Sequence, residues 1–322
     1  MAEMNLVQAV NSGLKCAMAD DEKVVVLGED VGLDGGVFRA CEGLLKQFGP
    51  KRVMDTPLAE SGIIGVSAGM AVAGLKPVPE IQFSGFLYMA LGQLINHVSR
   101  IRNRSRGAFT CPVIIRTPYG GGIRALEHHS ESMEAIYVHT PGLKVVIPSS
   151  PYDAKGLLIS AINGNDPVVF MEPSRLYRAI REEVPDGSYT IPLGKAKVVK
   201  EGNAVTVISW GSMLQQAKLA LKHTDVDVEL IDLRTLKPLD VEAIISSVKK
   251  TGRCIIVQEA PRTGGLASEI IALINEQALL SLKAPVSRVA GFDTAFPLYK
   301  LEDYYLPGTE RIINAIEATV NY

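Results

Sequence analysis

Short runs of β-branched and apolar residues alternate along the chain with stretches whose apolar residues recur at helical spacing. Leu6, Val10 and Leu14 follow the helical period, and Val24–Leu27 then forms a continuous apolar run. Such a run is typical of a strand that is buried on both faces, as in parallel sheets. The alternation therefore predicts an α/β fold with mainly parallel sheets covered by helices.

The same reading places further elements in both halves of the chain. In the first half, strands are expected at Val78–Phe83, Val113–Arg116, Lys144–Ile147 and Val168–Glu172, and helices over Leu58–Leu75, Leu87–Arg104 and Tyr152–Asn163. The last helix has Ser150 as its N-cap and Pro151 at its first position. In the second half, strands are expected at Val205–Ser209, Val226–Asp232, Cys254–Glu259 and Val286–Ala290, and a helix over Leu266–Leu280.

The regular pattern fails between Pro173 and Pro192, a stretch that also contains Pro185 and Gly187. Proline and glycine interrupt helices and strands and favour turns. A chain of 322 residues also suits two domains of ordinary size. We therefore expect a first domain over 1–180, a linker over 181–194 and a second domain over 195–322.

Composition excludes several classes of function. The net charge is −2 and the basic residues are scattered, so no nucleic-acid footprint is visible. The one basic cluster, Arg100–Arg106, is typical of a solvated helix end. The four cysteines form no CxxC pair, which argues against zinc or iron–sulfur sites and fits a reducing compartment. Neither a targeting peptide nor a membrane-length apolar run is present, so we expect a cytoplasmic protein.

Polar chemistry is expected where strands end and helices begin. In Asp55–Gly62, Thr56 can cap a helix, Pro57 suits its first position, and Glu60 lies in its first turn. The alternative role for Glu60 is stabilisation of the positive helix end, worth up to about 1 kcal/mol.

The helix that follows is poor in side-chain bulk, with glycine at positions 62, 65, 69 and 74. Each glycine inside a helix costs up to about 1 kcal/mol relative to alanine. Such a helix is expected to approach another element or another subunit closely. A tightly packed internal helix is an equally good interpretation.

Two further segments carry candidate groups. At the end of the strand predicted near Val78–Phe83, Gln82 and Phe86 offer an amide and an aromatic face, although core packing also explains the aromatic ring. After three glycines at 120–122, which permit an irregular backbone near a ligand, His128 and His129 can act as general acid or base. The pair lacks the helical spacing of metal-binding histidines, so no metal site is expected, and plain surface exposure is the alternative.

The order of these motifs resembles one family over nearly the whole chain. The matching segments are Gly28–Gly32, Asp55–Glu60, Pro79–Phe83, His129–Ser132 and His139–Val146, followed by Asp232–Asp240 and Gln258–Ala260. Together they resemble the β subunit of the decarboxylating component of 2-oxoacid dehydrogenase complexes, a transketolase-like thiamin diphosphate enzyme. The resemblance implies a pyrimidine-binding domain followed by a transketolase C-terminal-like domain.

The resemblance also implies a shared active site. In this family an α subunit holds the diphosphate and Mg²⁺ through a Gly-Asp-Gly motif, which this chain lacks, and the assembly is an α₂β₂ heterotetramer. Glu60 matches the glutamate that contacts the pyrimidine ring and promotes its imino tautomer. Leu58, Gln82 and Phe86 match positions that line the same pocket. His129 matches the histidine that assists proton transfer or acyl transfer to a lipoyl domain.

The implied reaction is oxidative decarboxylation of pyruvate or a branched-chain 2-oxoacid with acyl transfer to lipoyl; an acetoin dehydrogenase β subunit is the alternative. Asp293 resembles acidic residues that bind the acyltransferase core, and Asn163–Pro167 resembles a monovalent-cation site. Phe86 stands where some relatives have tyrosine, and His128 is a further departure. A 2-oxoacid:ferredoxin oxidoreductase subunit is disfavoured because the chain lacks cysteine clusters for iron–sulfur ligation. A single-chain transketolase-like enzyme is disfavoured by the length of the chain and by the missing diphosphate motif. A scaffold that only tethers an acyltransferase core would require Glu60 and His129 to be inert.

Overall fold

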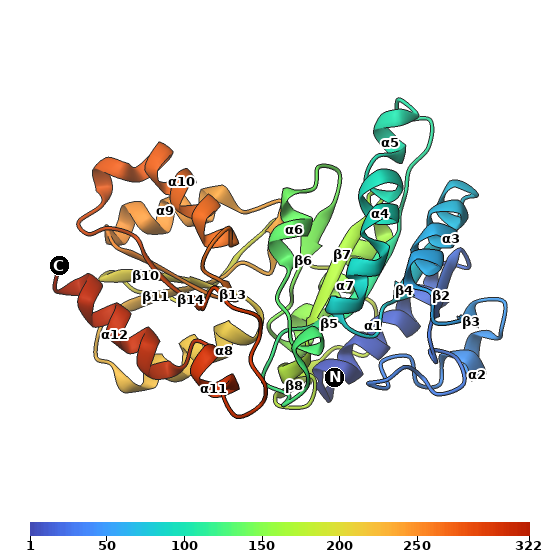
Figure 1. Ribbon diagram of the computed structural model, residues 1–322, viewed down its shortest axis with the longest axis horizontal. Coiled ribbons are helices and arrows are strands. Elements are labelled where there is room, and N and C mark those ends of the chain that lie inside the picture. The colour runs from blue at the N-terminus through green and yellow to red at the C-terminus, as the bar shows by residue number, and fades with distance from the viewer.

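Two parallel-rich sheets, each lying between layers of helices, form the two lobes of the molecule (Figure 1). The computed structural model describes residues 1–322. A seven-stranded sheet lies in one lobe and a five-stranded sheet in the other. The predicted α/β class with mainly parallel sheets is therefore confirmed. No helix is both long enough and apolar enough to cross a membrane.

The seven-stranded sheet is built almost entirely from the first half of the chain. Its strands are, in spatial order, β12 (Thr235–Lys237), β6 (Lys144–Val146), β7 (Val168–Pro173), β5 (Ile114–Tyr119), β4 (Lys76–Glu80), β2 (Val24–Gly28) and β3 (Val53–Asp55). All neighbouring strands are parallel except β12, which pairs antiparallel with β6. The second half of the chain thus completes the first lobe's sheet.

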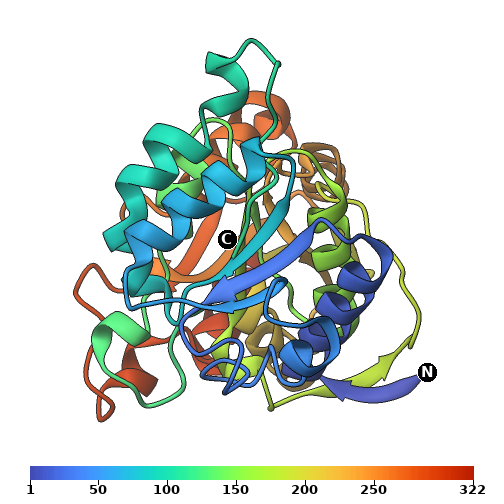
Figure 2. The same ribbon diagram turned by 90° about the vertical axis from the view of Figure 1, so that its right-hand side faces the viewer.

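Successive residues of each strand face opposite sides of this sheet, so one strand contributes to two cores. Val168 and Phe170 pack in one core, and Val169 and Met171 pack in the other. Helices α1 (Leu6–Asp20), α2 (Leu44–Phe48) and α7 (Pro151–Asn163) cover the first face. The second face is covered by α3 (Glu60–Val72), η1 (Ser84–Ala90), α4 (Leu91–Gln93), η2 (Leu94–Val98), α5 (Ile101–Arg104) and α6 (Glu134–His139). Figure 2 shows the sheet between the two layers.

The five-stranded sheet has the order β14 (Ser287–Gly291), β13 (Cys254–Pro261), β10 (Val205–Ser209), β11 (Val228–Asp232), β9 (Lys197–Lys200), and only β9 runs antiparallel. Helices α8 (Gly211–Ala220) and α12 (Thr309–Val320) pack on one face, and α9 (Val241–Thr251) and α10 (Leu266–Ala278) on the other. The remaining short elements are η3 (Glu127–His129), η4 (Ser174–Leu176), η5 (Leu221–His223), η6 (Leu279–Ser281) and α11 (Glu302–Tyr305).

Most predicted elements are confirmed within a few residues, including α7, where the Ser150 side chain accepts the amide hydrogen of Asp153. The single helix expected over Leu87–Arg104 is wrong. It is divided into a 3-10 segment, short α turns and a π turn, an arrangement that keeps Leu87, Leu94 and Val98 fully buried. Within the segment predicted as a linker, β8 (Arg181–Val184) pairs with β1 (Ala2–Asn5).

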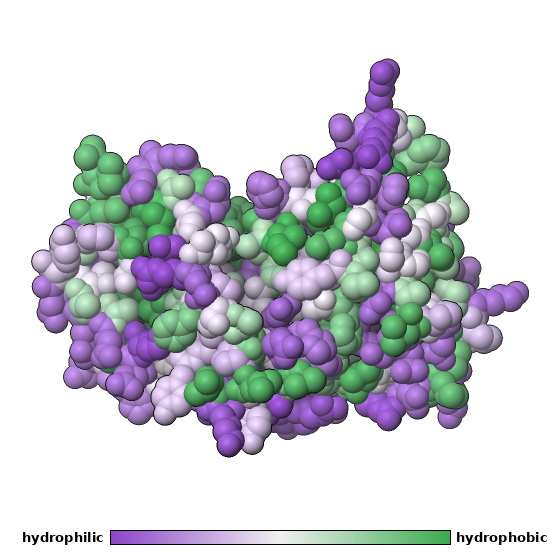
Figure 3. Space-filling view, in the orientation of Figure 1, coloured by the Kyte–Doolittle hydropathy of each residue, from purple (hydrophilic) through white to green (hydrophobic).

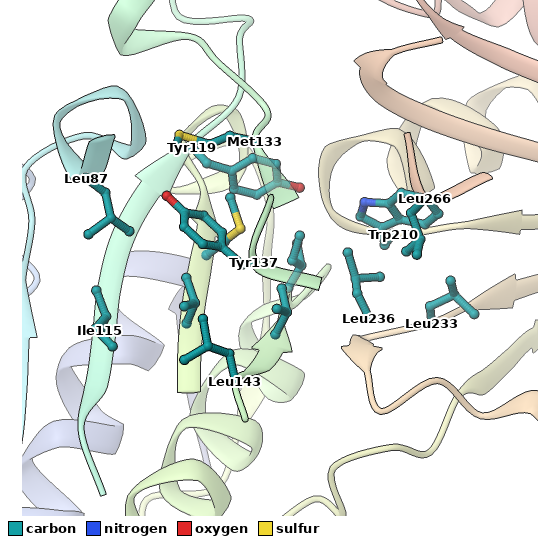
Figure 4. Packing of buried hydrophobic residues seen from close by; sticks show 14 of the residues in the cluster. Leu87, Ile115, Tyr119, Met133, Tyr137, Leu143, Trp210, Leu233, Leu236 and Leu266 are labelled. Carbon is teal, nitrogen blue, oxygen red and sulfur yellow. The ribbon is translucent and has the colours of Figure 1, made fainter. Parts of the chain in front are cut away.

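The two lobes share one hydrophobic core. Trp210, Leu233 and Leu236 of the second half pack in the same cluster as Tyr137 and Leu143 of the first (Figure 4). A fully buried Trp or Tyr contributes a large apolar area. The lobes are therefore joined by core packing.

One carboxyl group lies inside this core. Glu134 is fully buried, and neither carboxylate oxygen has a hydrogen-bond partner. Burial raises the pKa of Glu134 from 4.5 to about 7. Because the folded state holds this proton more tightly than the unfolded chain, the resulting stability is present at low pH and is lost as the pH rises through about 7.

The glutamine in Glu134→Gln is neutral at every pH, so the variant should not lose stability as the pH rises. The stability of the variant relative to the wild type should rise between about pH 5 and about pH 8, by up to about 3 kcal/mol. Thermal unfolding at several pH values measures the difference. Glu276→Gln, at an exposed position of α10, is the control. A difference that does not change with pH would contradict this effect of Glu134.

Candidate functional site

The predicted site residues follow strands that end at the same edge of the seven-stranded sheet. Parallel strands β2, β3 and β4 end at Gly28, Asp55 and Glu80, and Gly28 lies in register with both of the other residues. Just beyond these ends, or beyond β5, come Leu58, Glu60, Gln82, Phe86 and His129. The carboxyl edge of a parallel sheet is where ligands bind in α/β proteins. The segments that carry the candidate residues therefore follow strands of this one sheet.

A buried ion network lies directly beneath this edge. The Arg116 guanidinium group is 1% exposed and donates to Glu80 at 2.8 Å and to Glu172 at 2.7 Å. Tyr177 donates to the same Glu172 carboxylate at 2.7 Å. Removing one partner from such a network strands a buried charge. The network therefore fixes the ends of β4, β5 and β7 relative to one another.

Glu60 is the first residue of α3, and its side chain is largely buried. The predicted cap is wrong: α3 starts after Ala59, and neither Thr56 nor Pro57 belongs to its first turn. The reason is that the Thr56 amide donates to the Gly28 carbonyl at 3.0 Å and so continues the pairing of β2 with β3. The chain crosses to the helix only afterwards, which places Glu60 at the helix start.

Glu29 lies beside Glu60 and was not singled out as a site residue from the sequence. It is largely buried, and its pKa is raised by burial and then by the neighbouring Glu60 carboxylate. Asp55 accepts amide hydrogen bonds from Gly32 at 2.6 Å and Leu33 at 3.1 Å, and so fixes the loop after Glu29. The available signal was the position of Glu29 directly after a buried strand.

The remaining predicted lining residues differ in their surroundings. Gln82 is half-buried, and its side-chain amide lies 3.5 Å from the Asp30 carboxylate. Phe86 is half-buried, and its ring lies against those of Phe83 and His129. Leu58 is 79% exposed, so this chain alone leaves it without a packed environment.

His129 belongs to an aromatic cluster. Its ring centroid lies 4.2 Å from that of Phe83, 5.3 Å from that of Phe86 and 4.3 Å from that of His128. Burial, and then His128, lower the pKa of His129 below its ordinary value of 6.5, while Glu127 opposes this shift. The ring is therefore neutral near pH 7, and its buried Nδ1 has no hydrogen-bond partner. A neutral imidazole in this position can accept a proton.

The histidine loop approaches η1 at a glycine. A Cβ atom at Gly85 would lie 2.1 Å from the carbonyl oxygen of His128, so no other residue fits there without movement. The neighbouring Ser84 hydroxyl donates to the Glu131 carbonyl at 3.0 Å. Gly85 therefore brings η1, with Phe86, against the segment that carries His129.

A cavity of about 560 Å³ between the lobes, visible as a hollow in Figure 3, is lined by other residues, among them His139, Leu236 and Glu269. In the segment Asn163–Pro167, which resembles a monovalent-cation site, the Asp166 carboxylate pairs with Lys144 at 3.0 Å and with Arg102.

The fold and this sheet edge define a transketolase-like protein. The family described as "Transketolase, pyrimidine binding domain" matches residues 2–180, and "Transketolase, C-terminal domain" matches residues 194–312. A solved structure titled "Split gene transketolase, inactive beta4 tetramer" has the same fold, with a TM-score of 0.81 at 22% identity over 99% of this chain and 98% of that one.

Similarity in sequence identifies the group within this class. The "Pyruvate dehydrogenase E1 component subunit beta" of Acholeplasma laidlawii is 52% identical over 315 residues, which cover 97% of this chain and 96% of that protein. The protein of the same name from Staphylococcus epidermidis is 51% identical over 325 residues, covering 100% of both chains. The chain belongs to the family of β subunits of the decarboxylating (E1) component of 2-oxoacid dehydrogenase complexes.

Gly85→Ala tests the contact between η1 and the histidine loop. The added methyl group would clash with the His128 carbonyl, so we expect destabilisation by about 1–3 kcal/mol. Gly92→Ala in α4, where a Cβ atom would meet nothing within 4 Å, is the matched control and should be neutral or mildly stabilising. Thermal unfolding measures the stability of both variants relative to the wild type. Equal stability of the two would show that the close approach at Gly85 is absent.

Proposed function

We propose that this chain is the β subunit of a pyruvate dehydrogenase E1 component. With an α subunit and thiamin diphosphate, it would decarboxylate pyruvate oxidatively and pass the acyl group to a lipoyl domain. The observation that carries the proposal is about half identity over essentially the whole length to two subunits of that name. Branched-chain 2-oxoacids and acetoin are the competing donors.

The residues at the sheet edge fit the aminopyrimidine end of thiamin diphosphate. Glu60 would offer its largely buried carboxylate to a ring nitrogen, and the Thr56 hydroxyl and His129 Nδ1 are buried polar atoms without partners. Phe86 offers an apolar wall, and Gln82 an amide. When bound, the cofactor supplies the electron sink that decarboxylation requires. The protein residues hold and orient its ring.

The same edge does not fit the diphosphate end. Glu29 and Glu60 make it locally acidic, and a diphosphate needs a cation and backbone donors. The chain has no Gly-Asp-Gly segment. We therefore assign the diphosphate and Mg²⁺ to the α subunit.

The outer face of α3 supports contact with another subunit. Gly62, Val66, Gly69 and Ala73 are exposed on it, and a Cβ atom at Gly69 would meet nothing within this chain. Gly65 alone of these helix glycines approaches another element, since a Cβ atom there would lie 3.6 Å from side-chain atoms of Gln93. Packing within the chain thus explains only part of the small-residue pattern. A subunit packed on this face, as in an α₂β₂ heterotetramer, explains the rest.

Asp293 is the proposed contact with the acyltransferase core. It lies exposed, and its carboxylate accepts the amide and hydroxyl hydrogens of Thr263 at 2.8 and 2.7 Å. These hydrogen bonds, the one from the Thr263 backbone amide first, lower the pKa of Asp293 and keep it charged for a basic partner.

The four free cysteines agree with a cytoplasmic assembly.

Dye-coupled oxidation of pyruvate and of 3-methyl-2-oxobutanoate, with thiamin diphosphate and Mg²⁺, tests this function. We expect pyruvate oxidation only when the chain is combined with a co-expressed α subunit. Glu60→Gln should lower turnover by about 100-fold or more while the subunits still assemble, because the amide cannot hold the ring proton as a carboxylate does. Glu276→Gln should match the wild type. Preference for the branched-chain substrate, or activity retained in Glu60→Gln, would contradict the substrate or the residue assignment respectively.

His129→Ala tests the assigned histidine. Removing the neutral imidazole should lower the rate of acyl transfer to a free lipoyl domain by about 100-fold. His128→Ala removes a neighbouring ring and a group that lowers the pKa of His129, so it should raise that pKa and have a much smaller effect on the rate at pH 7. Mass spectrometry of the acylated lipoyl domain measures both variants. A larger loss in His128→Ala would reverse the assignment.

A further inference from the structure

The glycines at 120–122 lie against the second lobe of the molecule. A Cβ atom at Gly120 would lie 2.7 Å from the Glu259 carboxylate, and one at Gly121 would lie 2.2 Å from the Phe296 ring. Gly120 and Gly122 also have positive φ values, +81° and +90°. From the sequence, these glycines permit an irregular backbone near a ligand. In the structure they bring the backbone close to carboxylates and an aromatic ring of the C-terminal half.

The amide groups of this loop donate to two buried glutamates. Gly121 donates to Glu259 at 2.5 Å, Arg124 donates to Glu302 at 3.1 Å, and Gly122 donates to the other oxygen of Glu302. Glu259 and Glu302 are 3% and 1% exposed. Hydrogen bonds from backbone amides to a carboxylate are the strong, charge-assisted kind.

Glu259 also holds the other end of the loop. Ser132 donates its hydroxyl hydrogen to Glu259 at 3.1 Å, and the Gly120 amide donates to the Glu131 carbonyl at 3.1 Å. Segment 120–132 is therefore a closed loop whose base rests on Glu259. The Ser212 hydroxyl, 2.7 Å away, fixes the second oxygen of that carboxylate.

Between these two anchored ends the loop carries the histidine pair. Its first half is fastened again at Arg124, which pairs with Asp303 at 2.8 Å and donates to the Tyr299 carbonyl at 3.0 Å. Its second half places His129 on the rings of η1. The C-terminal half thus sets where the loop leaves the sheet, and η1 sets where its tip lies.

We infer that Glu259 and Glu302 are positioning residues that hold the loop of residues 120–132 so that His129 reaches the active site. This inference rests on the proposed role of His129. Without the carboxylates, buried amide groups would lose their partners, and the loop would leave its present geometry. A displacement of a catalytic group by about 1 Å is enough to lower the reaction rate strongly. The second lobe therefore acts on the site through its carboxylates.

Hydrogen–deuterium exchange on the assembled enzyme tests the contact without using activity. In Glu302→Ala, peptides that span residues 120–132 should exchange about tenfold faster or more, whereas peptides from β5 and β7 should not change. Glu302→Gln keeps one acceptor oxygen and should have an intermediate effect. Glu276→Ala, exposed on α10, is the control. Unchanged exchange in the loop of Glu302→Ala would overturn the inference.

A double-mutant cycle with His129→Ala tests whether the glutamate acts through the histidine. Alone, Glu302→Ala should lower acyl transfer by about tenfold or more, and in the His129→Ala background it should lower it no further. Independent, multiplying effects would overturn the positioning role. If His129→Ala itself has no effect while loop exchange rises in Glu302→Ala, the role of His129 fails and the contact stands.

Discussion

The buried guanidinium group of Arg116 is the constraint on which the candidate site depends. It lies between Glu80 and Glu172, so one side chain on β5 fixes the ends of β4 and β7. A buried charge tolerates little displacement, because loss of either partner costs several kcal/mol. Gln82 and Phe86 follow Glu80 within a few residues. The network therefore holds the strand end from which Gln82 and Phe86 follow.

The second lobe contributes to the first in three ways of increasing specificity. It adds β12 to the edge of the seven-stranded sheet, it shares the core around Trp210, and it places Glu259 and Glu302 under the histidine loop. The first two stabilise the molecule as a whole through burial of apolar surface. The carboxylates of Glu259 and Glu302 act at a few backbone amide groups of the histidine loop. A carboxylate can hold such atoms in one geometry, whereas apolar packing tolerates small shifts.

Much of this architecture could be predicted from the sequence, because buried strands and capped helices leave local signals. Val205–Ser209 was predicted with its observed bounds, and Ser150 caps α7 as expected. Short edge strands such as β9 and β12 were missed because their pairing depends on distant partners. The start of α3 was placed too early, since Thr56 satisfies a strand partner, Gly28, rather than the helix.

The sequence supports a hypothesis for the site where it resembles a family, but it does not predict contacts that depend on the approach of distant segments. Glu60, Gln82 and His129 stand in recognisable motifs, and the structure places them beyond the ends of neighbouring strands. Gly85 and Gly120–Gly122 have no local signature that names their neighbours, because the relevant atoms belong to His128, Glu259 and Phe296. A glycine in a sequence permits a close approach of another segment but does not show whether one occurs or which atoms make it, since a Cβ atom at Gly69 or Gly92 would meet nothing.

The chain alone presents an unfinished surface, and its physical character indicates what completes it. Leu58 is 79% exposed and Met89 is 72% exposed, and the outer face of α3 exposes Val66 together with Gly62 and Gly69. Apolar surface of this kind is costly in water and marks protein–protein contact when it is contiguous. The adjacent carboxylates of Glu29 and Glu60 would repel a diphosphate. Under the proposed function, the α subunit would cover the apolar face and bring the cation and amide donors, and so would meet both requirements.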